Sequence, residues 1–300
     1  MTVRRRIEGP LPSGPSSVCA VVVTYFPDHD IQARIEKLLA QVGKIVVVDN
    51  GSSEESFTSR SDLEKIDAIT VVAWPDNRGI AAALNEGIRE ARAMGFDWVL
   101  TMDQDSTLAP DAVEEMLEAY RSEGNAMGVA MLGPYYEAPN LLQIPTIGGT
   151  PCTSKITSVL AIITSGTLMP TSLLDMVGPF REELFIDNVD IEFCWRVRRA
   201  GFLVGVAHQA KMEHHLGTLE HLGSFGYASH PPIRTYYRTR NFIWLLRETF
   251  WQDPHFFRDR LLKFVLFSVK AILLLRPKWS HLALYWQGIV DGVFGRMESH

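Results

Sequence analysis

The chain has 300 residues, of which 46% are hydrophobic and 21% charged, so it can bury a large core and is not a disordered protein. Its formal net charge of -6 argues against a general nucleic-acid binder, which depends on cationic contacts with phosphate. Cys19, Cys152 and Cys194 lie far apart, which argues against a disulfide framework or a zinc site and is typical of a reducing cytoplasm.

The N-terminus carries three arginines at positions 4 to 6, followed by prolines and glycine instead of an apolar segment. This pattern predicts a flexible tail over residues 1–17 and not a signal peptide. No stretch of about 18 apolar residues follows anywhere in the sequence, so a membrane-spanning helix is not expected.

The first half of the chain alternates valine-rich runs with segments of helical periodicity. The predicted strands are Val18–Thr24, Lys44–Val48, Ile69–Ala73 and Trp98–Met102. The predicted helices are Ile31–Gln41, Ile80–Met94 and Asp111–Ser122. This order predicts an α/β fold with a doubly wound, mostly parallel sheet flanked by helices, whose ligands gather at the carboxyl ends of the strands.

The second half is less regular. Tyr135–Ser158 is expected to form a loop or an antiparallel excursion, because it is long and contains proline, glycine and threonine. Further predicted elements are strands at Gly128–Gly133, Leu160–Ile163, Thr167–Met169 and Val204–Ala207, a helix at Asn188–Ala200, helical structure from Ile233 through Leu275, and a final helix near Leu282–Phe294. We therefore expect a catalytic domain over 18–232 and a helical extension over 233–300.

Asp103 and Asp105 follow an apolar strand and stand one residue apart. Two carboxylates this close repel each other, and a hard divalent cation such as Mg2+ or Mn2+ relieves the repulsion while keeping positions open for phosphate oxygens. The alternative is a surface turn that leads into the helix predicted at Asp111.

Five motifs follow one another between residues 18 and 217. They are Val21-Val-Val-Thr-Tyr25, Val46-Val-Val-Asp-Asn-Gly-Ser52, Asn77-Arg-Gly-Ile-Ala-Ala-Ala-Leu-Asn-Glu-Gly-Ile88, Met102-Asp-Gln-Asp-Ser106, and a segment from Phe185 to Gly201. Their order and spacing resemble glycosyltransferase family 2, inverting sugar-nucleotide enzymes with the GT-A fold. The last two motifs are most similar to bacterial rhamnosyltransferases of surface polysaccharide assembly, including O-antigen.

The resemblance implies that Thr24 and Asp49 contact the pyrimidine base and ribose of the donor, with Asn77 and Arg78 nearby. Arg78 has the charge to complement a diphosphate. The alternatives are a plain turn at Asp49 and an exposed surface arginine at Arg78.

The resemblance also implies that Asp103 and Asp105 hold Mg2+ or Mn2+ against the donor diphosphate, with Asp105 as the expected direct ligand. His214 falls where the family can place a further metal ligand, three residues before Gly217. His215 is the neighbouring alternative, and a structural role for the histidine is the other.

Inversion requires a base that takes the proton of the acceptor hydroxyl. The resemblance implies Asp190, which stands six residues before Arg196, although Val189 replaces the acidic neighbour common in relatives. The rivals are Asp187, as a cap or an acceptor-binding residue, and Glu192, which can also pair with Arg196 on the helix.

The C-terminal third is basic between Arg234 and Lys278, with ten Lys or Arg against three acids. Tyr236–Trp244 resembles a segment of the rhamnosyltransferases and is assigned no catalytic role. Leu261–Leu275 predicts either a helix at a membrane interface that attracts anionic lipid, or a core helix packed on the sheet domain.

The resemblance, together with these acidic residues, implies a metal-dependent inverting glycosyltransferase that transfers L-rhamnose from dTDP-L-rhamnose to a saccharide or polyprenyl-linked saccharide acceptor. The alternatives are another UDP- or dTDP-sugar as donor, and a non-catalytic sugar-nucleotide-binding protein. The expected location is the cytoplasm, either free or peripheral at the inner face of the cell membrane, with no nucleic-acid partner.

Overall fold

The computed structural model describes residues 5–7, 9–136, 154–214, 219–222, 225–228, 230–273 and 277–297. Its contacts divide the chain into two compact units, of which the first comprises Met1–Phe180 and Phe193–His215, and the second Arg181–Glu192 and Leu216–His300. Each unit is described separately below. Cys152, His215 and most of the segment predicted as a loop or antiparallel excursion lie outside the described residues.

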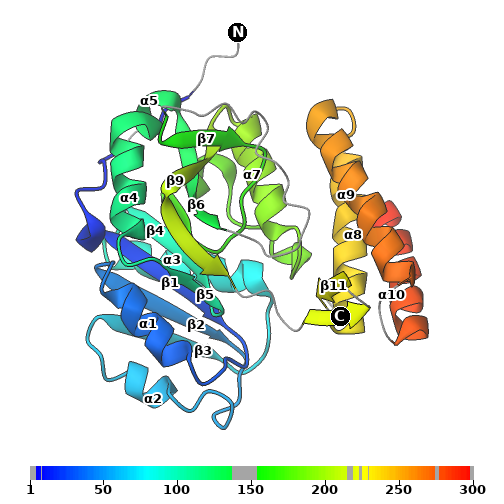
Figure 1. Ribbon diagram of the computed structural model, residues 1–300, viewed down its shortest axis with the longest axis horizontal. Coiled ribbons are helices and arrows are strands. Elements are labelled where there is room, and N and C mark those ends of the chain that lie inside the picture. Colours follow the sequence, from blue (N-terminus) through cyan, green and yellow to red (C-terminus); the bar gives the residue numbers. More distant parts are fainter. Residues whose placement is uncertain are drawn as a thin grey trace. The chain divides into compact units, whose positions relative to one another are not determined.

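The first unit contains a mixed, mostly parallel sheet with the strand order β3-β2-β1-β4-β8-β6-β9-β5, to which β7 adds by pairing with β9 (Figure 1). The strands β1 to β4 are parallel, as their valine-rich runs predict, and β6 is parallel to β9. The bounds are β1 Val18–Thr24, β2 Lys44–Asn50, β3 Ile69–Trp74, β4 Trp98–Asp103, β5 Ser106–Leu108, β6 Val129–Tyr136, β7 Ile156–Val159, β8 Thr167–Pro170 and β9 Leu203–His214.

Helices cover both faces of this sheet, as expected for a doubly wound fold. Val18, Ala20 and Val22 of β1 share one buried cluster with residues of α1 and α4. On the other face, a Cβ atom on Gly87 of α3 would lie 2.2 Å from Cγ1 of Val21, so only glycine permits this close approach. The bounds are α1 Ile31–Leu39, α2 Arg60–Leu63, α3 Ile80–Ala93, α4 Ala112–Ala119, α5 Asn125–Met127 and α6 Leu173–Val177.

The helix α7, Val189–Arg199, begins in the second unit and ends in the first. The second unit otherwise consists of the hairpin strands β10 Leu219–Leu222 and β11 Phe225–Ala228, and of three long helices: α8 Pro232–Thr249, α9 Pro254–Leu273 and α10 Lys278–Phe294. The helix α10 packs tightly on α8 because Gly288 and Gly292 face its backbone; a Cβ atom on either would lie 2.7 Å from a carbonyl oxygen of α8.

The structure differs from the sequence predictions at several places, and short elements such as α2, α6 and the β10–β11 hairpin were not predicted. The helical segment predicted from Ile233 through Leu275 is broken after Thr249, because Pro254 has no N–H and Asp253 starts a new helix by accepting a hydrogen bond from the backbone N–H of Phe256 at 3.1 Å. Leu160–Ile163 is not a strand. The short strand β5 was not predicted, because three residues carry no recognisable periodicity.

Among the described residues, no helix combines the length and the apolar content required to cross a membrane.

Candidate active site

The sheet register brings the predicted donor and metal residues of the first unit to one edge. Thr24 pairs with Asp49 across β1 and β2, and Val23 pairs with Asp103 across β1 and β4. Since all three strands are parallel, their carboxyl ends lie side by side. The register therefore brings Thr24, Asp49 and Asp103 together, and Asp105 lies two residues beyond Asp103.

Asp49 is a fully buried carboxylate, with 0% of its surface exposed. Its Oδ1 accepts hydrogen bonds from the backbone N–H and hydroxyl of Ser52 at 3.2 and 2.5 Å, and lies 3.5 Å from the hydroxyl of Thr24. Its Oδ2 lies 2.6 Å from Nη2 of Arg60, in an ion pair without hydrogen-bond geometry, so this oxygen is buried with no hydrogen-bond donor among the described residues. A buried carboxylate oxygen in this state is suited to accept the N–H of a ligand.

The turn after Asp49 packs on the turn before α3. Gly51 adopts a φ of 94°, and a Cβ atom there would lie 2.6 Å from the backbone N of Asn77. The side-chain amide of Asn50 donates a hydrogen bond to the side-chain oxygen of Asn77 at 3.0 Å, and its oxygen accepts one from the backbone N–H of Arg78 at 2.8 Å. Asn77 therefore braces the two turns, while the half-exposed Arg78 lies over the ring of Trp74 at 4.8 Å.

Gln104, between the two acids, is a residue of the site that the sequence predictions overlooked. Its side chain accepts the backbone N–H of Tyr25 at 2.7 Å and donates to the carbonyl of Tyr25 at 3.1 Å. Its own carbonyl accepts Nε of Arg34 at 2.6 Å. Gln104 thus fastens the end of β4 to the end of β1, which fixes the distance between the acidic turn and the Thr24 end of the site.

The acidic turn and His214 meet in the sheet. The strand β5 pairs antiparallel with β9, and the register places Ser106, the neighbour of Asp105, opposite His214. Carboxylate and imidazole groups are residue types that Mg2+ or Mn2+ accepts as ligands. Among the residues with described side chains, which do not include that of His214, no three acidic, histidine or cysteine side chains form a metal-binding group.

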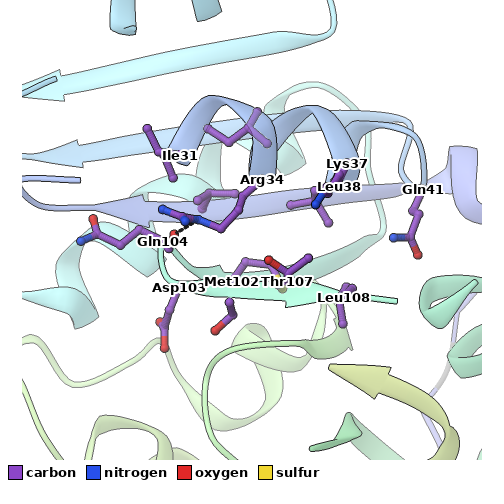
Figure 2. Close-up of a pocket in the computed structure, with 13 residues that line it drawn as sticks. Ile31, Arg34, Lys37, Leu38, Gln41, Met102, Asp103, Gln104, Thr107 and Leu108 are labelled. Carbon is purple, nitrogen blue, oxygen red and sulfur yellow. Dashed lines mark hydrogen bonds between the residues drawn. The ribbon is translucent and has the colours of Figure 1, made fainter. Parts of the chain in front are cut away.

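A narrow hollow lies beside the acidic turn, between α1 and the strands β4 and β5 (Figure 2). Apolar residues such as Ile31 and Leu38 line much of it, and Arg34 reaches across it to Gln104. Figure 2 shows the carboxylate of Asp103 pointing away from α1. The hollow is therefore a gap beneath α1, and the Asp103 carboxylate, although Asp103 lines it, points away from that helix.

In the second unit, two carboxylates at the start of α7 have opposite electrostatic environments. Burial favours the neutral form of Asp187, but Arg234 and Arg238 outweigh it and hold the pKa of this carboxyl below its ordinary value. The guanidinium of Arg234 donates two hydrogen bonds, of 2.9 and 3.2 Å, to the carboxylate of Asp187. Burial raises the pKa of Asp190 to about 6, and the negative charge of Asp187 adds to the rise.

Glu192 forms an ion pair with an arginine. It is fully buried, and its Oε1 accepts Nε of Arg181 at 3.0 Å. Asn85 of α3 likewise has a structural role, because its amide exchanges two hydrogen bonds of 2.9 Å with the backbone of Phe180. Asp190 belongs to the second unit and the other predicted site residues to the first, so its position opposite them stays a prediction.

A mixed, mostly parallel sheet with acids at the carboxyl ends of its central strands is the GT-A arrangement. Comparison with known proteins agrees, since the family pattern described as Glycosyl transferase family 2 matches residues 19–154. The chain is 34% identical over 251 residues to dTDP-rhamnosyl transferase RfbF of Shigella flexneri, an alignment that covers 78% of this chain and 81% of that protein. The chain belongs to glycosyltransferase family 2.

Two further comparisons extend this result. Galactofuranosyltransferase GlfT1 of Mycobacterium tuberculosis (strain ATCC 25618 / H37Rv) is 26% identical over 218 residues, which covers 68% of this chain and 72% of that protein. Mannosyltransferase PcManGT from Pyrobaculum calidifontis, solved in complex with GDP-Man and Mn2+, superposes with a TM-score of 0.60 at 14% identity, covering 98% of this chain and 92% of that one. The latter likeness is one of fold.

Asp49→Asn is expected to weaken binding of a pyrimidine nucleoside diphosphate about tenfold or more, since a charge-assisted hydrogen bond contributes roughly 1.5–3 kcal/mol. Titration calorimetry with UDP and dTDP measures the change. Asp62→Asn, which removes an exposed acid paired with Lys65, serves as the control and should bind as the parent protein does. Equal affinity of the folded Asp49→Asn variant would contradict the assigned contact.

Proposed function

We propose that this glycosyltransferase transfers L-rhamnose from dTDP-L-rhamnose, with inversion, to a saccharide or polyprenyl-linked saccharide acceptor of a cell-surface polysaccharide. The donor follows from the similarity to a dTDP-rhamnosyl transferase, which extends over about four fifths of both chains. The similarity to a galactofuranosyltransferase keeps another UDP- or dTDP-sugar as the second candidate donor. The case for catalysis over simple binding rests on the similarity to sugar transferases and on the contrast between Asp187, which is held by two nitrogens of Arg234, and Asp190, which is not paired with an arginine at hydrogen-bond distance among the described contacts.

The donor would lie along the carboxyl ends of β1, β2 and β4. Asp49 would accept the N3–H of the pyrimidine with Oδ2, which is ion-paired with Arg60 but has no hydrogen-bond donor among the described residues, while Ser52 and Thr24 hold Oδ1 in place. Asp103, Asp105 and His214 would hold Mg2+ or Mn2+ at the diphosphate. The cation would neutralise the charge that develops on the leaving group as the bond to the sugar breaks.

Asp190 would act as the base. As the acceptor oxygen attacks the anomeric carbon, its proton passes to the carboxylate of Asp190 and the electron pair of the breaking bond goes to the nucleoside diphosphate. A carboxylate with a raised pKa binds this proton more strongly than an ordinary one, yet is still ionised at neutral pH. Asp187 is poorly suited to the role because Arg234 occupies both of its oxygens and lowers its basicity.

The acceptor class also bears on where the protein works. A polyprenyl chain confines its saccharide to the surface of a membrane. We therefore place this glycosyltransferase in the cytoplasm, as a peripheral protein at the inner face of the cell membrane.

Asp190→Asn is expected to reduce kcat with dTDP-L-rhamnose by about 100-fold or more, because the general base is lost. The Kd for dTDP should not change. The melting temperature at pH 8 should stay the same or rise, since the variant removes a charged carboxylate from a buried place. Glu183→Gln, an exposed acid in the same segment, is the control.

Turnover of both variants is measured across dTDP-L-rhamnose and other UDP- and dTDP-sugars, with and without a chelator. Full turnover by Asp190→Asn would refute the assignment of the base. A preference for another nucleotide sugar would replace the proposed donor and leave the base unaffected.

The pH dependence of kcat/KM provides an independent check. The charged groups near Asp190 are Asp187, Arg260 and Arg238. Because the base must be ionised and burial raises its pKa to about 6, kcat/KM should fall as the pH is lowered through about 6. Initial rates between pH 4.5 and 8.5 locate this limb. A limb near pH 4, the ordinary value for an exposed carboxyl, would contradict the buried environment.

A further inference from the structure

Two exposed apolar stripes run along the helices α9 and α10 of the second unit. On α9, Leu261, Val265, Val269 and Ile272 follow one another at helical spacing and are exposed, and Leu262 and Leu266 lie beside them. Isolated exposed apolar residues are common on proteins, but a continuous row over three turns marks a binding surface.

The stripe on α10 is bounded by aromatic residues. Trp279 is 83% exposed and Trp286 is 61% exposed, and Val290, Val293 and Phe294 continue the same face. The spacing of 7, 11, 14 and 15 residues from Trp279 keeps these side chains within one side of the helix. Tryptophan at the end of an apolar face is typical of the headgroup level of a membrane.

The charged residues are all basic over most of the segment that carries the stripes. From Arg260 to Val290 the sequence contains no Asp or Glu. The flanking Asp259 and Asp291 are engaged with Lys263 at 2.8 Å and Arg296 at 3.6 Å. Arg258 and Lys278 are exposed. A second copy of the chain would therefore bring cations against cations, whereas anionic lipid headgroups complement this surface.

We propose that the α9 and α10 stripes form a membrane-docking surface that lies in the headgroup region of an anionic lipid bilayer. The two helices would lie along the bilayer without crossing it, with leucine, valine and tryptophan in the interface and the flanking cations at the lipid phosphates. The surface rests on the proposed function only for its biological setting. It depends on neither the donor nor the base.

The test uses the full chain and vesicles of phosphatidylcholine with and without phosphatidylglycerol. The parent protein should sediment with the anionic vesicles, less with the neutral ones, and less at high salt. Val265→Glu with Val269→Glu should lower vesicle binding roughly tenfold or more while donor hydrolysis in solution is unchanged. The control is Leu11→Glu with Met176→Glu, two exposed apolar residues of the first unit.

The outcomes are distinct. Equal vesicle binding by the α9 variant and the parent would overturn the proposal, as would failure of the parent to bind anionic vesicles. Light scattering measures the oligomeric state of the same samples. A dimer that dissociates in the α9 variant, with no vesicle binding by either protein, would assign the surface to a second copy of the chain.

A second inference concerns the turn that precedes Asp190. Phe185, Asp187 and Asn188 have positive φ values of 61°, 63° and 65°, which are uncommon for residues other than glycine. Such backbone is strained and persists only where its surroundings hold it. Residues of α8 hold this turn in place.

Asn241 of α8 holds the backbone of this turn. It is 0% exposed, and its amide nitrogen lies 2.8, 2.9 and 2.8 Å from the carbonyl oxygens of Leu184, Ile186 and Asp187. The buried Arg240 next to it donates to the carbonyl of Glu183 at 2.6 Å.

Both residues belong to the Tyr236–Trp244 motif, to which the sequence analysis gave no role. A third member of the motif also contacts the turn, since the ring of Tyr237 stacks on Phe185 at 4.8 Å. The motif thus contacts the turn through the side chains of three of its residues.

We infer that Asn241 is a positioning residue, which keeps the left-handed turn in place and so holds Asp190 in its partly buried position at the start of α7. This inference rests on the proposed role of Asp190 as the base. Replacement of Asn241 would release three carbonyls and let water reach the turn. The carboxylate of Asp190 would then become better hydrated and less precisely oriented.

The test compares Asn241→Leu with Thr249→Val, which removes a buried hydrogen bond of 2.8 Å elsewhere on α8. Both variants should lose some thermal stability. Only Asn241→Leu should lower kcat, by on the order of 10- to 100-fold, with little change in the Kd for dTDP. Its kcat/KM profile should also lose its acid limb near pH 6 and fall at a lower pH.

The readouts separate the two proposals. If Asp190→Asn is inactive but Asn241→Leu behaves like Thr249→Val in kcat and in pH profile, the positioning role is wrong and the base assignment stands. If Asp190→Asn keeps full turnover, the base assignment is wrong and the positioning role is wrong with it.

Discussion

Parallel pairing of β1 with β2 and β4 is the constraint on which the rest of the first unit depends. Because parallel strands end at a common edge, Thr24, Asp49 and Asp103 come together although up to 79 residues separate them in the chain. The strands themselves are buried on both faces, so their valines form part of the hydrophobic core. The residues at the strand ends are not needed for that packing and can serve the site. Gln104 then ties two of these ends directly, through the backbone of Tyr25.

In the second unit the comparable constraint is electrostatic. Asp187 and Asp190 are three residues apart and both are partly buried, yet their pKa values move in opposite directions. The difference lies in their partners. Asp187 has a bidentate arginine, while Asp190 accepts a backbone N–H, that of Ile191 at 2.8 Å. One carboxylate is thereby held ionised as a structural group, and this anion in turn raises the proton affinity of its neighbour.

Features that depend on neighbouring residues could be predicted from the sequence, whereas features that depend on residues far apart in the chain could not. Valine runs, helical periodicity and strand-end acids are local patterns, and they located the parallel strands correctly, with Thr24, Asp49 and Asp103 at one edge of the sheet. The break before Pro254 also has a local signal, the dipeptide Asp-Pro. The sequence analysis overlooked it because apolar helical periodicity continues on both sides. Gln104 and Asn241 could not be predicted, because their partners lie 79 and more than 50 residues away and a lone amide has no periodicity. Their importance comes from what packs against them.

The same long-range dependence links the helices of the second unit to the chemistry proposed for it. The strained turn before Asp190 has no glycine, so its shape cannot come from local preference and must be imposed by α8 through Asn241 and Arg240. The helix α8 is in turn fixed by α10, through Gly288, Gly292 and the hydrogen bond of 3.0 Å between Tyr236 and Asp291. Since α9 and α10 also carry the apolar stripes, lipid contact and the geometry of the turn are properties of one packed bundle. A bilayer that stabilises the bundle would therefore also stabilise the turn that holds the proposed base.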